Sequence, residues 1–461
     1  MIAPQELIER ITAAAQYEDC IVIVEAKTQA NLRWASSTLT TNGVIAEQTV
    51  TVIAFVAVEG GIATGSITKT SVELDEIPGI AKEAGLVALA AGKAEDQAPL
   101  LRDKTMGDWA SAHPATGPAV FSTFAPQLGD LFKKSKADSI ELFGYAEHTH
   151  QTTWVGSKGG LRLRHDQPAG RLEMTGKSHN RSRSTWEGRA TRDFNDVDLT
   201  GVDAGIRQRL EWQSRTAAKA AGRYQTVLPA GSVADLIAFL LWTSPARDAA
   251  EGRSVYSKKG ELGKTRIGEA LANLPVNIYS DPTFKGLESS PFNIASSSGP
   301  FSSVFDNGLP QEKWNFLKDG KLNGLVSTRA VEKATGIPYG SGGDNVIMDL
   351  PGSSGDLNTQ ISKVKSGLLL TTLWYIRMVD PVTNLLTGLT RDGVYEIKDG
   401  EVIGAVNNFR WNESPVDLLG RIASAGATKV TATREFEELG RTATPDVIFD
   451  EFNMSTVSQA N

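Results

Sequence analysis

Metal binding is the first chemistry to consider, because the chain has five histidines, all of them before residue 180. His148 and His150 lie two residues apart in an expected strand, where alternate side chains point to the same face. His165 could lie opposite them across a glycine turn. A zinc site also needs further nitrogen, sulfur or oxygen ligands, and Glu147 points to the other face. We therefore interpret these histidines as polar strand residues and keep a metal site as the less favoured alternative.

Three other motifs could carry chemistry, but each has a simpler interpretation. Gly340–Gly343 lacks the lysine and hydroxyl residue of a phosphate-binding loop, so it predicts a turn. The serines at 296–298 and 302–303 lack the G-x-S-x-G context of a nucleophilic serine. The segment Lys177–Arg192 is rich in basic residues and could bind nucleic acid. We favour an exposed hairpin there, because the chain as a whole is acidic.

Size and composition limit the class of protein. The chain has 461 residues, too many for one hydrophobic core, so two or more domains are expected. Its 40% hydrophobic and 22% charged residues are typical of soluble proteins, and its 44 glycines indicate many turns in a sheet-rich fold. The net charge of −7 argues against a general nucleic-acid surface. A single cysteine, Cys20, excludes disulfides within the chain and is expected to be a buried strand residue.

The N-terminal sequence predicts a protein without a targeting or membrane segment. MIAPQELIERITAAAQ is interpreted as an amphipathic helix that contains acidic residues, unlike a secretion signal. No apolar run reaches the ~18 residues that a membrane span needs. We expect a cytoplasmic protein that does not contact a membrane.

Hydrophobic periodicity predicts an N-terminal α+β domain over residues 1–125, and a hairpin-rich region over 126–222 that continues this half. The expected elements are helices over 4–16, 76–91, 127–136 and 203–220, a strand over 20–26 that turns at 27–29 into a strand over 30–36, hairpin strands over 49–58 and 61–66, and strands across 139–163. Mixed helices and antiparallel strands of this kind are typical of an α+β fold.

Residues 223–461 are predicted to form a C-terminal domain rich in antiparallel strands. Its most apolar helix is expected within 227–249, with Ser232 able to cap it. Residues 280–310 have little regular pattern, and long loops of this kind are usually functional or mobile. A further helix is expected over 415–425.

Residues 366–415 contain the densest strand pattern in the chain and the candidate binding residues. Charged residues in such an apolar run must be paired if they are buried, or else they serve a cleft or a partner. The polar residues near 412 follow a strand and lie among aromatic side chains, although they could simply cap the helix at Pro415. The candidates for a cleft or partner interface are Arg377, Arg391, Arg410, Asn412 and Glu413.

The order of these motifs resembles the TldD/PmbA family, once called modulators of DNA gyrase, and looks like its PmbA (TldE) branch in an actinobacterial form. The resemblance extends over some four hundred residues as a collinear set, and no single short motif is diagnostic. It implies two α+β domains rich in antiparallel sheet, with a metalloprotease-like cleft in the second. The stretches that carry it are ANLRWASSTLTTNG (30–43), WVGSKGGLRLRHDQPAGRLEM (154–174), TWEGRATRDFNDVD (185–198), SDPTFKGLESSPFN (280–293), VFDNGLP (304–310), residues 367–421 and DEFNMSTVSQA (450–460).

The resemblance also implies a two-chain metallopeptidase that trims unfolded or precursor peptides. In this family a TldD chain carries an HExxxH helix, with a cysteine nearer its C-terminus as a further zinc ligand. The corresponding helix here is VADLIAFLL (233–241), whose only ionisable residue is Asp235, and GRTATP (440–445) has no cysteine. We therefore expect no catalytic residue, metal ligand or cofactor on this chain, and zinc on a TldD-like partner in a heterodimer.

Two alternatives to general peptide trimming stay open. The same heterodimer could hydrolyse an amide or peptide bond in a specialised biosynthetic pathway. The chain could also be a homodimeric peptide-binding protein without catalysis. A direct link to DNA gyrase has no independent support in the acidic sequence.

Overall fold

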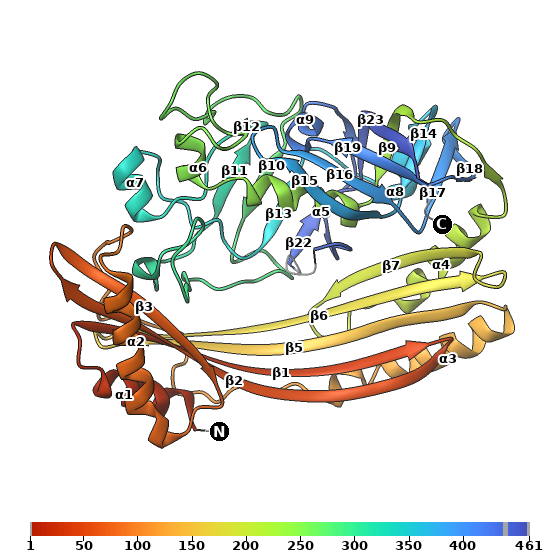
Figure 1. The fold of residues 1–461 in the computed structure, drawn as a ribbon. Helices are drawn as coiled ribbons and strands as arrows, with labels where there is room; N and C mark the ends of the chain where they lie inside the picture. Colours follow the sequence, from red (N-terminus) through yellow and green to blue (C-terminus); the bar gives the residue numbers. More distant parts are fainter. Residues whose placement is uncertain (1, 437–440, 459–461) are drawn as a thin grey trace.

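The computed structural model describes residues 2–436 and 441–458, and its N-terminal half is built on one sheet of very long strands. The strand order is β3-β2-β1-β5-β6, with β7 pairing to the far side of β6 and the short β4 to its start. Figure 1 shows this sheet as a curved layer beneath the C-terminal half. The strands are β1 (Asp19–Ala35), β2 (Thr38–Val58), β3 (Gly61–Thr70), β4 (Thr105–Met106), β5 (Glu141–Ser157), β6 (Arg162–Ser178) and β7 (Arg183–Thr191).

Helices cover the outer face of this sheet. The even-numbered residues of β1, such as Val22 and Val24, pack against Leu7 in the helix over 4–14 and Ile80 in the helix over 77–91. Trp34 lies in a second cluster with the helices over 124–137 and 199–212. The predicted helix over 4–16 is confirmed, because Leu7, Ile8 and Ile11 are buried on one side. The helical elements are α1 (Pro4–Ala14), η1 (Leu74–Glu76), α2 (Ile77–Ala91), η2 (Pro118–Phe121), α3 (Phe124–Ala137) and α4 (Leu199–Trp212).

The inner face of the sheet is apolar at one end and polar along the rest. Ile23 and Phe55 form a core with Phe292 and Phe305, which come from the long segment 280–310. That segment therefore anchors the C-terminal half to the sheet, although its only helical turn is η3 (Val304–Asp306). Farther along, the odd-numbered residues of β5 and β6 are mainly polar and face the C-terminal half.

The predicted turn at 27–29 is wrong. Strand β1 continues through these residues, which keep the alternating burial of a sheet, and the chain reverses at Ser36 and Ser37. Both serines have positive φ values, 47° and 56°, as a two-residue hairpin turn requires. Residues 38–48 extend β2 well before the predicted start at Thr49.

Two sheets share one large core in the described part of the C-terminal half. The ten-stranded sheet comprises β8 (Thr216–Ala217), β9 (Gly222–Leu228), β14 (Ser366–Leu370), β15 (Leu373–Asp380), β16 (Leu385–Thr390), β17 (Val394–Lys398), β18 (Glu401–Val406), β19 (Phe409–Glu413), β20 (Ile422–Ala425) and β23 (Val447–Val457). The six-stranded sheet comprises β10 (Asn277–Ser280), β11 (Trp314–Lys318), β12 (Lys321–Leu322), β13 (Val346–Asp349), β21 (Lys429–Thr431) and β22 (Thr442–Thr444). The helices are α5 (Ala230–Trp242), α6 (Ala246–Ala250), α7 (Arg329–Thr335), α8 (Leu357–Ser362) and α9 (Pro415–Leu419).

Three predicted helices differ from the observed ones. The segment 227–249 begins as the end of β9, continues as the buried α5, and ends in α6. Residues 415–425 are not one helix: α9 ends at Leu419, Gly420 is its C-cap, and the chain continues as the strand β20. The helix expected over 203–220 is α4, which begins at Leu199 because the side chain of Asp198 caps Gly201.

The fold class is as predicted, a mixed fold rich in antiparallel strands. Among the described residues, no helix is both long and apolar enough to cross a membrane.

Candidate functional site

Helix α5 begins at the junction of the two halves, and its start is fixed by neighbouring strands. Its sequence is almost entirely apolar, and ten of its residues, from Ala230 to Leu240, are buried. The carboxylate of Asp446 accepts the N–H of Ala230 at 2.9 Å and also pairs with Lys429. Thr444 donates its hydroxyl to the carbonyl of Ala230. Ser232, predicted as the cap, instead lies inside the first turn and donates to the carbonyl of Thr371 at 3.3 Å.

A cavity of about 690 Å³ opens at this start of α5, and we call it the α5 cavity. Its walls come from the edge strand β7, one face of α4, the first turn of α5, residues 356–358 and residues 429–434. It therefore lies where the N-terminal sheet meets the C-terminal half.

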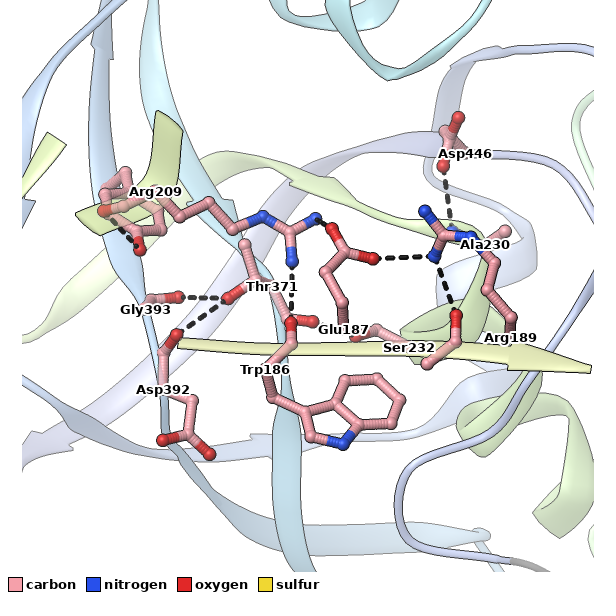
Figure 2. A network of polar contacts seen from close by, with 12 residues as sticks. Trp186, Glu187, Arg189, Arg209, Ala230, Ser232, Thr371, Asp392, Gly393 and Asp446 are labelled. Carbon is pink, nitrogen blue, oxygen red and sulfur yellow. Dashed lines mark hydrogen bonds and ion pairs between the residues drawn. The ribbon is translucent and has the colours of Figure 1, made fainter. Parts of the chain in front are cut away.

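The edge of β7 facing this cavity is occupied by a network of arginine side chains (Figure 2). Arg209 of α4 donates to the carbonyl of Trp186 at 2.8 Å, and Arg189 donates to the carbonyl of Gly188 at 2.7 Å. The carboxylate of Glu187 holds both guanidinium groups, at 2.9 Å and 2.6 Å. These contacts satisfy two carbonyls of an edge strand that pairs, among the described residues, with β6 alone.

Arg434 forms a second wall of the cavity. Its guanidinium lies over the rings of Trp186 and Trp374, 4.8 Å and 5.2 Å from their centres, and Asp392 is 3.7 Å away. It also approaches Glu173 of β6 at 3.7 Å and so bridges the two halves. Burial lowers the pKa of Arg434, although it remains a cation.

Asp235 holds the segment that carries Arg434. It is fully buried in α5, and its carboxylate accepts the backbone N–H groups of Arg434, Glu435 and Phe436 at 3.1–3.3 Å. Burial raises the pKa of this carboxyl to about 7, while the three N–H groups oppose the shift. Asp235, the only ionisable residue in α5, thus has a structural role, because its carboxylate binds backbone N–H groups of the same chain.

The chemistry of the α5 cavity comes mainly from its charged side chains. No histidine or cysteine is among the described residues that line it. Guanidinium groups on its walls can donate paired hydrogen bonds to carboxylates or peptide carbonyls. The charged lining residues are the cations Arg189, Arg209, Lys429 and Arg434, and the anions Glu187, Asp356 and Asp446.

None of the five predicted cleft or interface residues is among those that line the α5 cavity. Arg377 is exposed, lies 4.1 Å from the ring centre of Tyr375 and contacts Glu435 at 3.4 Å. Arg391 lies 5.4 Å from the ring centre of Trp374, the ring that Arg434 also contacts.

The other three predicted residues lie on β19. Arg410 is exposed and donates to Thr387 at 3.3 Å, and Asn412 accepts from the same hydroxyl at 2.9 Å. Glu413 points to the buried side and pairs with Arg421. Arg410 and Asn412 thus share a contact at Thr387, whereas Glu413 is buried. Their role at an interface stays a prediction.

Sequence reasoning missed the residues that surround the cavity. Glu187 and Arg189 lie in the basic segment 177–192, which was correctly predicted as a hairpin but interpreted as solvated. Their separation by two residues on a strand was the available signal, because it places opposite charges on one face. Arg209 and Arg434 are too distant in sequence to be grouped with them.

Zinc ligands of the HExxxH type have no counterpart in α5. Asp235 does not fit a metal, because its oxygens already accept three backbone N–H groups. Across the described residues, no group of three or more His, Cys, Asp or Glu side chains is arranged to hold a metal ion. Gly440, part of the segment without the expected cysteine, lies outside the described residues.

Three of the five histidines, His113, His148 and His150, form a polar cluster on the outer face of the sheet, where His148 is buried and the other two are half-buried. His148 and His150 share a face as predicted, but His165 lies on the opposite face, because its β5 partner is Thr153. His113 joins the cluster instead, with its ring centre 5.7 Å from that of His150. Burial lowers the pKa of His113, His148 and His150.

This cluster predicts a loss of stability in mild acid. The lowered pKa values mean that the unfolded chain binds protons that the folded cluster resists, so stability is complete above about pH 6.5 and falls as the pH drops below it. Nearby Asp166 partly offsets the effect by raising the pKa of His113 and His150. We expect a lower urea midpoint at pH 5.5 than at pH 7.5.

Replacing His150 by phenylalanine should reduce this pH dependence, because the buried Nε2 of His150 has no hydrogen-bond partner to lose. His179→Gln, in the turn after β6, is the matched control and should keep the dependence of the wild type. Equal midpoint shifts for the wild type and His150→Phe would contradict the assignment.

Comparison with known proteins defines the family and the fold of this chain. The family model for the PmbA/TldA metallopeptidase C-terminal domain matches residues 221–456, more than half of the chain. The chain therefore belongs to the PmbA/TldD metallopeptidase family, as its sequence resemblance predicted. A sequence search of curated proteins finds no match.

Solved structures show that the likeness covers nearly the whole chain. TldE from Thermococcus kodakarensis is 15% identical, with a TM-score of 0.79 over 97% of this chain and 99% of that chain. A protein from Thermotoga maritima, described as a candidate modulator of a DNA gyrase, is 15% identical, with a TM-score of 0.74 over 98% and 100%. A similarly described protein from Bacteroides thetaiotaomicron is 13% identical, with a TM-score of 0.74 over 99% and 100%. At these identities the likeness establishes the fold.

Proposed function

We propose that this chain is the subunit without zinc in a two-chain metallopeptidase, and that a TldD-like partner carries the zinc. The complex would cleave or trim unfolded or precursor peptides. The proposal rests on family membership together with the composition of α5.

The observation that carries the proposal is that Asp235, the only carboxylate of α5, binds backbone N–H groups of the same chain. The helix that would have to present two histidines and a glutamate is apolar, and its one carboxylate anchors residues 434–436. An HExxxH site requires nitrogen ligands from this helix, and none is present in its sequence. This absence supports placing the metal of the metallopeptidase on another chain.

The α5 cavity gives this subunit a role in binding peptide. Arg189, Arg209 and Arg434 offer guanidinium donors beside the rings of Trp186 and Trp374. Carbonyls and a terminal carboxylate of an extended peptide are suitable acceptors for such donors. Glu187 holds Arg189 and Arg209, and the rings of Trp186 and Trp374 hold Arg434, before a peptide arrives.

The test compares peptide cleavage by this chain alone, by a TldD-like chain from the same genome alone, and by the two expressed together. We expect chelator-sensitive cleavage only from the pair. Within the pair, Arg189→Met should raise KM about tenfold, the effect of losing one charge-assisted hydrogen bond.

Arg192→Met, one residue after β7 and paired with the exposed Glu288, is the control for that variant and should leave KM unchanged. Chelator-sensitive cleavage by this chain alone would contradict the proposal. An unchanged KM for Arg189→Met would contradict the role of the α5 cavity.

A further inference from the structure

Residues 107–117 cross the outer face of the long sheet without forming a helix or strand, and we call them the strap. The strap begins beside β6, where the side chain of Arg164 donates to a strap carbonyl at 3.0 Å. It then passes over β5 to β1, because His113 contacts Thr152 on β5 and Thr28 on β1. The strap therefore lies across the middle of three long strands.

The surface beneath the strap is polar, unlike the rest of the outer face. On either side of Thr28 in β1, Ala26 belongs to the apolar core under α1 and α2, and Ala30 to the core under α3 and α4. Trp109, packed against the first of these, is the only strap residue in either core among the described residues. The strap is thus held mainly by hydrogen bonds, and segments with few apolar contacts open locally most easily.

The hydrogen bonds of His113 determine which of its nitrogens carries the proton. Thr152 donates its hydroxyl proton to the carboxylate of Asp166 at 2.5 Å, so its oxygen accepts the proton on Nδ1 of His113 at 2.8 Å. Thr28 accepts the N–H of Thr116, and its own proton is free for Nε2 of His113 at 3.2 Å. This pattern is complete for a neutral His113 with its proton on Nδ1.

His148 is held neutral in the same way and secures the end of the strap. Its Nε2 lies 2.8 Å from the carbonyl of Arg192, which can only accept, so Nε2 carries the proton. Its Nδ1 then accepts the hydroxyl of Thr116 at 2.7 Å. Thr116 therefore fastens the strap twice, through its side chain to His148 and through its N–H to Thr28.

We propose that the strap is a pH-sensitive latch, which is closed while His113 and His148 are neutral and opens when they take up protons in mild acid. A second proton on His113 points at the oxygen of Thr28, whose own proton then has no other acceptor among the described residues. A second proton on His148 likewise displaces the hydroxyl proton of Thr116. Each protonation therefore removes a hydrogen bond that holds the strap.

Burial and the charged neighbours set the direction of the switch. Burial is the largest cause and lowers the pKa of His113 and His148 in the closed state. Asp166 and Arg164 face His113 with opposite effects on its pKa, and Asp193 raises that of His148. Opening removes the burial, so both pKa values return toward about 6.5. The open state therefore binds more protons below this pH, and opening is favoured as the pH falls.

His150 adds a third titrating group beneath the strap. Its ring centre lies 5.7 Å from that of His113, and Asp166, Arg164 and His148 also act on its pKa. Positive charges on neighbouring rings repel each other, so protonation of His150 opposes closure as well. None of these side chains is among the described residues that line the α5 cavity, so the inference is independent of the proposed peptidase function.

Histidine NMR tests the hydrogen bonds of the closed latch. In protein labelled with nitrogen-15 histidine at pH 7.5, the chemical shifts should show His113 protonated at Nδ1 and His148 at Nε2. The variants His113→Gln and His148→Gln assign the two signals. A proton on Nε2 of His113 would overturn the proposal, because Thr28 would then not donate to it.

Cleavage by chymotrypsin after Trp109 measures the opening of the strap. The ring centre of Trp109 lies 5.7 Å from the guanidinium of Arg162, and its carbonyl accepts from Gln5 at 2.7 Å, so the closed strap should resist the protease. The rate is divided by that for a free peptide of residues 105–115, which cancels the effect of pH on the protease. We expect this ratio to rise about tenfold or more from pH 7.5 to pH 5.5. An unchanged ratio would overturn the proposal.

Two variants connect the cleavage to the latch. Thr116→Val removes the hydroxyl bound to His148 at nearly constant size, so cleavage should already be fast at pH 7.5. The double variant His113→Gln with His148→Gln cannot take up these protons, so its ratio should lose most of its pH dependence. His179→Gln, in the turn after β6, is the control and should behave as the wild type. Wild-type pH dependence in the double variant, or wild-type resistance in Thr116→Val, would contradict the latch.

Circular dichroism separates local opening from unfolding of the whole chain. The far-ultraviolet signal should be the same at pH 7.5 and pH 5.5, because the apolar cores under the four helices hold the sheet together. Loss of this signal at pH 5.5 would mean that the chain unfolds globally, and would overturn a local latch.

Discussion

Alanine in place of Asp235 is expected to lower the free energy of unfolding by about 3 kcal/mol. The substitution removes the acceptor of three backbone N–H groups, those of residues 434–436, and leaves a cavity at a fully buried position in the middle of α5. Urea denaturation at pH 7.5 measures the change. Asp417→Ala, at an exposed aspartate of α9, is the control and should stay within about 0.5 kcal/mol of the wild type.

Asp235→Asn refines the same test, because asparagine keeps one oxygen acceptor but places an N–H₂ group against backbone donors. We expect its free energy of unfolding to lie between those of the wild type and the alanine variant. Wild-type stability for Asp235→Ala would contradict the assignment of Asp235 as the anchor of residues 434–436. It would also reopen the question of whether α5 carries a functional carboxylate.

Alanine in place of Glu413 is expected to cost about 3 kcal/mol, the typical loss when one partner of a buried ion pair is removed. The carboxylate pairs with Arg421 and accepts the N–H of Asn453 at 2.7 Å, and its side chain is only 4% exposed. Arg421 also donates to the carbonyls of Asp450 and Glu451, which limits the loss.

Arg410→Ala is the matched control for Glu413, because Arg410 is exposed on the same strand and donates only to Thr387 among the bonds described. It should change the unfolding free energy by less than about 0.5 kcal/mol. Similar losses for the two variants, measured by urea denaturation, would contradict the division of β19 into a buried anchoring side and an open side.

Elements with a buried face could be predicted from the sequence, and elements without one could not. Helix α1 was found because Leu7, Ile8 and Ile11 recur at helical spacing. The first half of β2 was missed because no side is buried, so its threonines and asparagine show no alternation. The reversal at Ser36 and Ser37 was missed because it uses positive φ angles without glycine or asparagine.

The family was predictable because its motifs are collinear over most of the chain, and the match to residues 221–456 confirms it. The α5 cavity was not predictable from spacing. Its arginines come from β7, α4 and the segment after β21, and only tertiary packing brings Arg189, Arg209 and Arg434 together. Local patterns describe single elements, whereas this site lies where several elements meet.

Zinc content is the most direct test of the central claim that this chain is the subunit without metal. The chain is purified alone and as a complex with a TldD-like chain, and zinc is measured in both by atomic emission. We predict stoichiometric zinc in the complex and no stoichiometric zinc on this chain alone. Stoichiometric zinc that stays with this chain alone through dialysis, and is lost on adding a chelator, would contradict the account.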